Sequence, residues 1–108
     1  MTQPSVTVLI EYRALPDRIA RAVSELELLL ATVVANEPDC FGIRLLQDPM
    51  DEARVLLYEE WSSREAYLGA HLQTPHIKAF MARASELFSG RPTIQFWIQR
   101  SRHSRSPQ

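Results

Sequence analysis

The sequence is poor in cysteine and glycine and has no long hydrophobic run. Its one cysteine, Cys40, has no partner for an intramolecular disulfide, which fits a reducing compartment. The three glycines, Gly42, Gly69 and Gly90, match neither the GxGxxG nor the GxxxxGK pattern of phosphate-binding loops. No apolar run approaches the ~20 residues of a membrane helix, and residues 1–10 lack the pattern of a signal peptide. We therefore expect a cytoplasmic protein with no membrane partner.

Length and charge predict one domain followed by a short tail. The chain has 108 residues, of which 45% are hydrophobic, and this suits a single compact domain at residues 1–98. Residues 99–108 contain no apolar side chain and include three arginines, so we expect a disordered basic tail. Without those three, the body carries 9 basic against 13 acidic residues. A nucleic-acid-binding domain usually presents a basic face, so the body argues against a nucleic-acid partner.

The hydrophobic spacing predicts four strands and three helices. Strands are expected where β-branched and apolar residues cluster, at residues 6–12, 40–46, 54–61 and 93–98, with a polar turn at 47–52. A first helix is expected to begin near Asp17 and to end at residues 36–39, because apolar residues recur there every three or four positions. Ser62 and Glu65 form a capping-box pattern that opens a short helix to about His71.

A third helix is expected to start at Thr74 and Pro75, to continue to Leu87 and to be capped by Gly90. The resulting order, β-α-β-β-α-α-β, indicates the α+β ferredoxin-like split βαβ fold, with a four-stranded antiparallel sheet and its helices on one face. RNA-recognition modules share this topology, but residues 54–61 carry two carboxylates, Glu59 and Glu60, instead of the aromatic motif that stacks on bases.

The strands themselves predict a homodimer. They place apolar side chains on both faces of the sheet, although helices on one side would cover only one of those faces. Contiguous exposed apolar surface is unusual on a soluble monomer, and two-fold pairing is the commonest way to cover it. The alternative is that polar strand residues such as Glu11, Arg44 and Gln95 make one face compatible with water.

Aromatic, acidic and histidine residues gather around the end of the third strand. Trp61 ends that strand, and Tyr67 and His71 follow four residues apart, which places them on one helix face. These side chains are able to line an apolar pocket with histidine as a base, since its ordinary pKa lies nearest neutrality. They are equally consistent with ordinary core packing. His71 and His76 do not share a helix face, so no metal site is expected.

The same stretch resembles the signature of antibiotic-biosynthesis monooxygenase-type domains, and the resemblance extends over residues 5–98. The residues that carry it are Glu59, Trp61, Ala66, Tyr67, His71, Pro75, His76 and Phe80, with Pro38, Asp39 and Cys40 upstream. The resemblance implies a dimeric α+β barrel in which two sheets face each other. It also implies a cofactor-independent monooxygenase that acts with dioxygen on a small aromatic, phenolic or quinol substrate.

In that interpretation His71, Trp61 and Tyr67 are catalytic, and Phe80, Glu59 and His76 bind the substrate. Haem-degrading relatives use an asparagine on the first strand, which residues 6–12 lack, so haem cleavage is disfavoured. No cofactor and no metal are expected. The alternative function is a non-catalytic dimeric barrel that binds a small apolar ligand.

Overall fold

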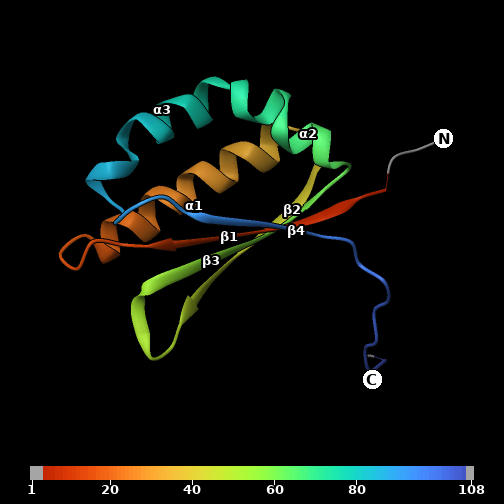
Figure 1. Cartoon of the computed structure of the whole chain (residues 1–108), viewed down its shortest axis with the longest axis horizontal. Coiled ribbons are helices and arrows are strands. Elements are labelled where there is room, and N and C mark those ends of the chain that lie inside the picture. Colours follow the sequence, from red (N-terminus) through yellow and green to blue (C-terminus); the bar gives the residue numbers. More distant parts are fainter. Residues whose placement is uncertain (1–3, 107–108) are drawn as a thin grey trace.

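The computed structural model describes residues 4–106 and contains one antiparallel sheet with helices on one face (Figure 1). The strands are β1 (Val6–Arg13), β2 (Cys40–Asp48), β3 (Asp51–Trp61) and β4 (Thr93–Trp97). They lie in the order β2-β3-β1-β4, so β3 and β1 occupy the middle of the sheet. This order confirms the predicted ferredoxin-like α+β fold.

Three helices lie against the sheet: α1 (Ile19–Asn36), α2 (Arg64–Leu68) and α3 (Pro75–Arg83). Two short 3₁₀ segments, Ala70–Gln73 and Ala84–Glu86, extend α2 and α3. None of the helices within residues 4–106 is long and apolar enough to cross a membrane.

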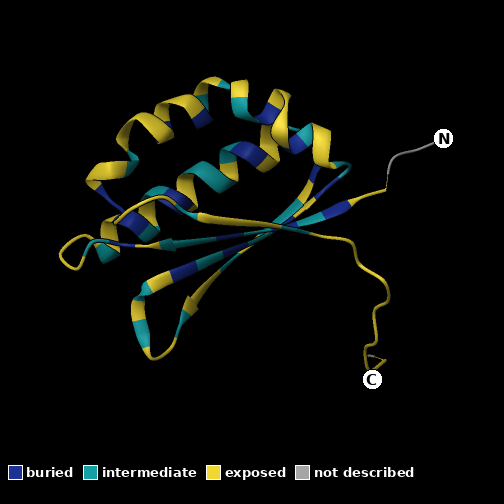
Figure 2. Cartoon of the chain, viewed as in Figure 1, coloured by how far each residue is buried: buried dark blue, intermediate teal, exposed yellow. Residues whose placement is uncertain are grey.

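The core forms where the helices meet the sheet (Figure 2). Alternate residues of the two central strands are buried there, namely Val6, Val8 and Ile10 of β1 and Val55 and Leu57 of β3. The matching face of α1 buries Ala22, Leu26 and Val33. Complete burial of a Leu or Val side chain stabilises the fold by roughly 1.5–3 kcal/mol.

The opposite face of the sheet has no covering element among residues 4–106 (Figure 1). The pairing register places Leu9 beside Tyr58, and Leu46 beside Leu56, on this uncovered face. Trp97 of β4 lies on the same face and is 55% exposed. The sheet therefore has apolar side chains on both faces.

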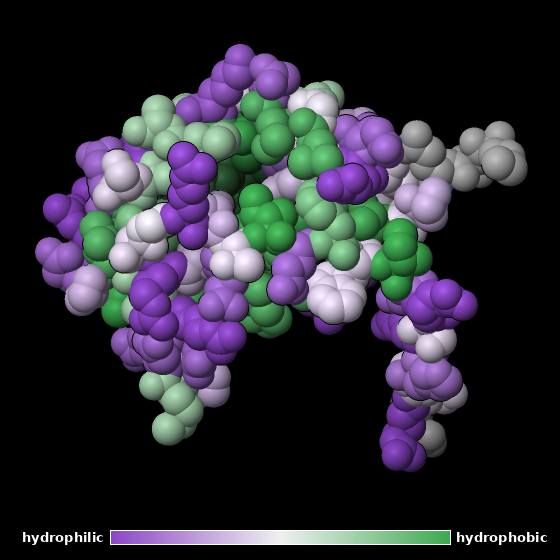
Figure 3. Space-filling model, in the orientation of Figure 1, coloured by the Kyte–Doolittle hydropathy of each residue, from purple (hydrophilic) through white to green (hydrophobic). Residues whose placement is uncertain are grey.

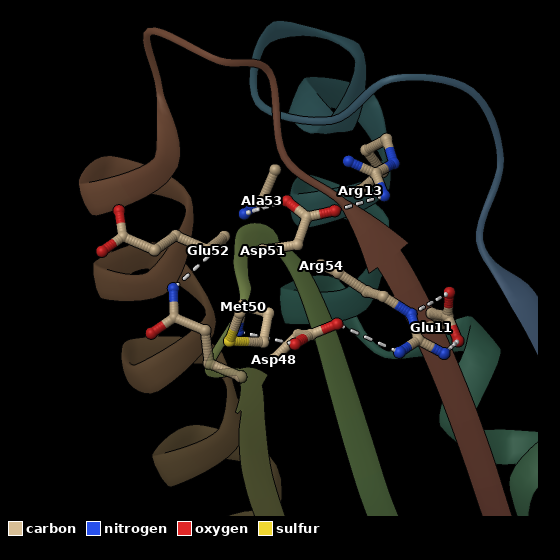
Figure 4. Close-up of polar contacts among 9 residues, drawn as sticks. Glu11, Arg13, Asp48, Met50, Asp51, Glu52, Ala53 and Arg54 are labelled. Atoms are coloured by element: carbon tan, nitrogen blue, oxygen red, sulfur yellow. Dashed lines mark hydrogen bonds and ion pairs between the residues drawn. The ribbon is translucent and has the colours of Figure 1, made fainter.

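Ion pairs tie the end of the β2–β3 hairpin to β1 (Figure 4). Arg54 Nε donates to Glu11 Oε2 at 3.0 Å, and Arg13 Nη2 donates to Asp51 Oδ2 at 2.8 Å. Arg54 Nη1 also reaches Asp48 Oδ2 at 3.3 Å. These side chains are largely exposed, so each pair contributes at most about 1 kcal/mol.

The expected turn at residues 47–52 is wrong, because the strands continue through most of it. β2 extends to Asp48 and β3 begins at Asp51, which leaves only Pro49 and Met50 in the turn. The polar side chains stabilise this tight connection: Asp48 Oδ1 accepts from the backbone N–H of Met50 at 2.8 Å. Apart from the two strand ends at this turn, the predicted strand ends are correct to within one residue.

Four helix ends differ from the expected ones. Ser63, not Ser62, caps α2 by accepting from the N–H of Ala66, because the Ser62 hydroxyl is bonded to Asp39 at 2.6 Å. The helix α2 ends at Leu68, so His71 lies in the following 3₁₀ segment.

The third helix ends at Arg83 instead of Leu87, since the backbone tightens into a 3₁₀ turn there. Gly90, at φ 72°, therefore lies in the loop before β4 and does not cap the helix. The first helix begins at Ile19, two residues after Asp17. Of the expected tail, residues 99–106 form no helix or strand and are exposed. Residues 107–108 of that tail and residues 1–3 of the expected domain lie outside the described residues.

Candidate active site

A cavity of about 760 Å³ lies between the sheet and the helices α1 and α3. Figure 3 shows a recess on this side of the molecule with hydrophobic residues around it. Its walls are mainly aliphatic and aromatic, with Ile10, Leu29, Leu57, Phe80 and Phe88 among them. A few polar side chains also reach it, namely Tyr12, Glu59, Tyr67, His71, Ser85 and Arg91. A mostly apolar cavity with a few convergent polar groups is the usual form of a small-molecule site.

His71 is held at the cavity wall by its neighbours. Its Nδ1 lies 2.8 Å from Oε1 of Glu37, and its side chain is only 5% exposed. The imidazole ring packs at a tilt against the ring of Trp61, with centroids 4.4 Å apart, and against that of Tyr67, at 5.0 Å. Burial lowers the pKa of His71, although the hydrogen bond and charge of Glu37 oppose that effect. The ring is therefore neutral near pH 7.

The second ring nitrogen of His71 is left without a partner in the described residues. Its Nε2 forms no hydrogen bond with any of residues 4–106, whereas every fully buried side-chain nitrogen or oxygen among them has a partner. Nε2 must therefore have accessible surface. Because His71 is part of the cavity wall, we infer that this surface faces the cavity. A neutral imidazole nitrogen in this position is able to accept a proton from a bound molecule.

Glu59 is a buried carboxyl group beside the same cavity. It lies on the helix-facing side of β3, is 3% exposed, and accepts a 2.8 Å hydrogen bond from Nε1 of Trp61. Burial raises the pKa of Glu59 from 4.5 to about 7, while the Trp61 hydrogen bond lowers it and the charge of Glu37 raises it. Glu59 therefore exists as both carboxylic acid and carboxylate at neutral pH.

Two tyrosines complete the polar part of the cavity. Burial and the nearby charge of Glu59 raise the pKa of Tyr67 well above its ordinary value, and raise that of Tyr12 to about 12. Both phenols are therefore protonated near neutral pH and are available as hydrogen-bond donors. The ring of Tyr12 packs on Phe88 with centroids 4.5 Å apart, which fixes its place in the wall.

The structure brings four of the six residues expected in the site to the cavity wall: Glu59, Tyr67, His71 and Phe80. The other two, Trp61 and His76, do not line the cavity. Trp61 is 1% exposed and lies behind Glu59, whereas Nε2 of His76 contacts Oε2 of Glu37 at 2.6 Å. Both therefore contact the site through another side chain.

Sequence reasoning missed Glu37, Tyr12 and Arg91. In the sequence, Glu37 is only part of the polar segment that ends the first helix. His71 and His76, which it contacts, lie 34 and 39 positions further along the chain, and no spacing rule links residues so far apart. Tyr12 was identifiable in principle, because strand alternation places it on the same face as Val8 and Ile10. Within residues 4–106, no group of three or more His, Cys, Asp or Glu side chains is arranged to hold a metal ion.

Solved structures resemble the chain over nearly its whole length. A protein from Pseudomonas aeruginosa has a TM-score of 0.82 at 23% identity, covering 94% of this chain and 99% of its own. A candidate antibiotic biosynthesis monooxygenase from Caulobacter crescentus has a TM-score of 0.82 at 26% identity, covering 93% of each chain. A Bacteroides thetaiotaomicron protein of unknown function, described as a possible oxidoreductase, has a TM-score of 0.78 at 16% identity, covering 90% and 99%.

No curated protein matches the chain. The family model described as antibiotic biosynthesis monooxygenase matches residues 5–83, which include β1 to β3 and all three helices, and with them Glu37, Glu59, His71 and His76. The match covers well over half of the 108 residues. The chain therefore belongs to the antibiotic biosynthesis monooxygenase family.

Proposed function

We propose that this protein is a cofactor-independent oxygenase that acts with dioxygen on a small aromatic, phenolic or quinol substrate. The observation that carries the proposal is the open Nε2 of His71, a neutral base at the wall of a largely apolar cavity. Membership of the monooxygenase family supports the reaction type. The cavity volume of about 760 Å³ falls within the usual range for small-molecule sites.

The proposed reaction starts with a proton transfer. Nε2 of His71 accepts the phenolic proton, and the electron-rich phenolate passes one electron to dioxygen, giving a substrate radical and superoxide. These two species combine to a ring peroxide, which takes up the proton from His71. Where the carbon that bears the peroxide also carries a hydrogen, cleavage of its C–H bond and of the O–O bond releases water and leaves one oxygen atom on the substrate as a carbonyl. The protein contributes a base, orientation and exclusion of bulk water.

The other cavity residues have roles that follow from their positions. Phe80 offers an aromatic surface for the substrate ring, and Tyr67 offers a phenolic donor to a substrate oxygen. Glu59, with its pKa near 7, is able to accept from a substrate hydroxyl or donate to a substrate carbonyl. Trp61 acts through Glu59, to which it donates, and His76 acts through Glu37.

We also propose that two copies pair through the uncovered face of the sheet. Its apolar side chains include Leu9, Leu46, Leu56 and Trp97, and the ion pairs of Figure 4 lie at its hairpin end. Such a face suits a second copy of itself, since two-fold pairing covers the exposed apolar side chains of both copies.

Oxygen uptake tests the proposed function. The protein is supplied with air-saturated buffer and a panel of hydroquinones and anthrones, and uptake is compared with that of buffer alone. Uptake above the buffer rate for at least one substrate is expected. If no member of the panel is oxidised but some of them bind, as measured by calorimetry, the protein is a non-catalytic binder of small apolar ligands instead.

A further inference from the structure

One carboxylate joins the two histidines that lie between β3 and β4 in the chain. Glu37, the residue after the last turn of α1, is 11% exposed at its side chain. Its Oε1 lies 2.8 Å from Nδ1 of His71, and its Oε2 lies 2.6 Å from Nε2 of His76. The three side chains come from three separate segments, so the fold itself assembles them.

We propose that Glu37 is the positioning residue of the site, which keeps the proton of neutral His71 on Nδ1 and so leaves the lone pair of Nε2 facing the cavity. Its effect on catalysis rests on the proposed function, whereas its effect on the imidazole is measurable without any substrate.

The hydrogen-bonding capacity of a carboxylate determines the tautomer. A carboxylate only accepts hydrogen bonds, so an imidazole nitrogen at 2.8 Å from its oxygen carries the proton. In a neutral imidazole the other nitrogen is then the acceptor, and for His71 this is Nε2. Fixing the tautomer by the partner of the second nitrogen is the same device that orients histidine in hydrolase triads.

Glu37 is itself held in place. Its backbone N–H donates to the carbonyl of Val33 at 2.8 Å, and its carbonyl accepts from the N–H of Cys40 at 3.0 Å. His76 occupies the second carboxylate oxygen, which prevents the group from turning away from His71. A catalytic group supported by a rigid second layer of contacts keeps the precise orientation that catalysis requires.

The ionisable groups around His71 determine the direction of each expected change. Glu37 faces it from the end of α1, His76 from α3, Glu59 from β3 across Trp61, and Tyr67 from α2. Burial lowers the pKa of His71, Glu37 raises it, and His76 lowers it. Removing the charge of Glu37 therefore lowers the pKa of His71 further.

The first test is nuclear magnetic resonance on the ¹⁵N-labelled full chain, because imidazole nitrogen shifts report the tautomer directly. We expect neutral His71 to carry its proton on Nδ1 in the wild type. In the Glu37→Gln variant we expect His71 to titrate at a lower pH than in the wild type. Glu25→Gln is the matched control, since Glu25 also joins α1 to α3, through Arg83 at 3.0 Å, without touching His71. It should leave the tautomer and the titration of His71 unchanged.

Two results overturn the proposal: wild-type His71 protonated on Nε2, or a titration of His71 that is the same in Glu37→Gln as in the wild type. The tautomer of His71 in the wild type tests the proposal even if the Glu37→Gln variant fails to fold.

The second test uses the pH profile of kcat/KM with any substrate that the oxygen-uptake panel identifies. In Glu37→Gln the rising limb should move to lower pH, because the base is weaker, and the plateau should fall by about 10-fold or more. The loss is bounded by the roughly 10²–10⁴-fold that a general base contributes. A shifted His71 titration without any oxygen uptake by the wild type would reject the proposed function while leaving the role of Glu37 in orienting His71 intact. An unchanged pH profile in an active Glu37→Gln variant would reject that role in catalysis.

Discussion

Replacement of Glu59 by glutamine should stabilise the protein above neutral pH. Glu59 is almost completely buried, and its one hydrogen bond within residues 4–106 comes from Nε1 of Trp61. Glutamine has nearly the same shape, and its amide oxygen is able to accept the same hydrogen bond. The substitution therefore removes the ionisation of this carboxyl group and little else.

The magnitude follows from the pKa of Glu59 in the folded chain. Burial raises it from 4.5 to about 7, so the folded state binds a proton more tightly than the unfolded state. A group of this kind contributes its full stability below pH 4.5, and that contribution is lost as the pH rises through about 7. The difference between the two pKa values corresponds to about 3 kcal/mol at the high-pH limit.

The assay is urea denaturation of wild type and Glu59→Gln between pH 4.5 and pH 8.5, at one protomer concentration. The free energy of unfolding of Glu59→Gln minus that of the wild type should rise with pH by about 3 kcal/mol and then level off. Glu27→Gln, which changes an exposed glutamate on α1, should show no such rise. If the difference in free energy of unfolding between Glu59→Gln and the wild type stays constant or falls with pH, the argument that ionisation of this buried carboxyl group destabilises the fold is refuted.

Three further predictions concern the cavity and the sheet. His71→Ala should lower kcat/KM by about 10²–10⁴-fold in stopped-flow assays, whereas the control variant His103→Ala, in the exposed tail, should match the wild type. In the wild type, kcat/KM should rise as the pH passes the lowered pKa of His71. Trp61→Ala should cost about 3–5 kcal/mol by chemical denaturation, because Trp61 is core rather than cavity wall, and a much smaller cost would contradict that placement. Light scattering at micromolar concentration should give twice the 12.4 kDa chain mass, and Trp97→Arg should give the single mass; a wild-type monomer would reject the proposed pairing.

The fold was predictable because its signals are local and repeated. Apolar residues recur every three or four positions along one face of α1, and that face packs on the sheet: Ile19, Val23, Leu26, Leu30 and Val33. Helix ends were less predictable, since they depend on single side chains with distant partners. Ser62 satisfies the local rule for a helix cap, but its bond to Asp39 on a separate segment shifts the cap to Ser63.

The candidate site was only partly predictable for the same reason. Tyr67 and His71 are four residues apart, so local spacing places them together, and the structure has their rings 5.0 Å apart. The contact between His71 and Glu37 joins residues 34 positions apart, and only the folded chain brings them within hydrogen-bond distance. The direct neighbours of a reactive group are thus easier to predict from sequence than the residues that orient it.

The position of Glu59 shows how the strand pattern and the chemistry of the site are connected. On the helix-facing side of β3, Val55, Leu57 and Trp61 are apolar and buried, and Glu59 is the one charged residue in that series. A strand selected for stability alone would carry an apolar residue there, because a buried carboxyl group is costly without full pairing. The break in alternation coincides with the wall of the cavity and lies next to the ring of Trp61, which also contacts His71. Departures from an otherwise consistent pattern occur mainly where function requires them, so the buried carboxyl group of Glu59 beside His71 supports the roles proposed for these two residues.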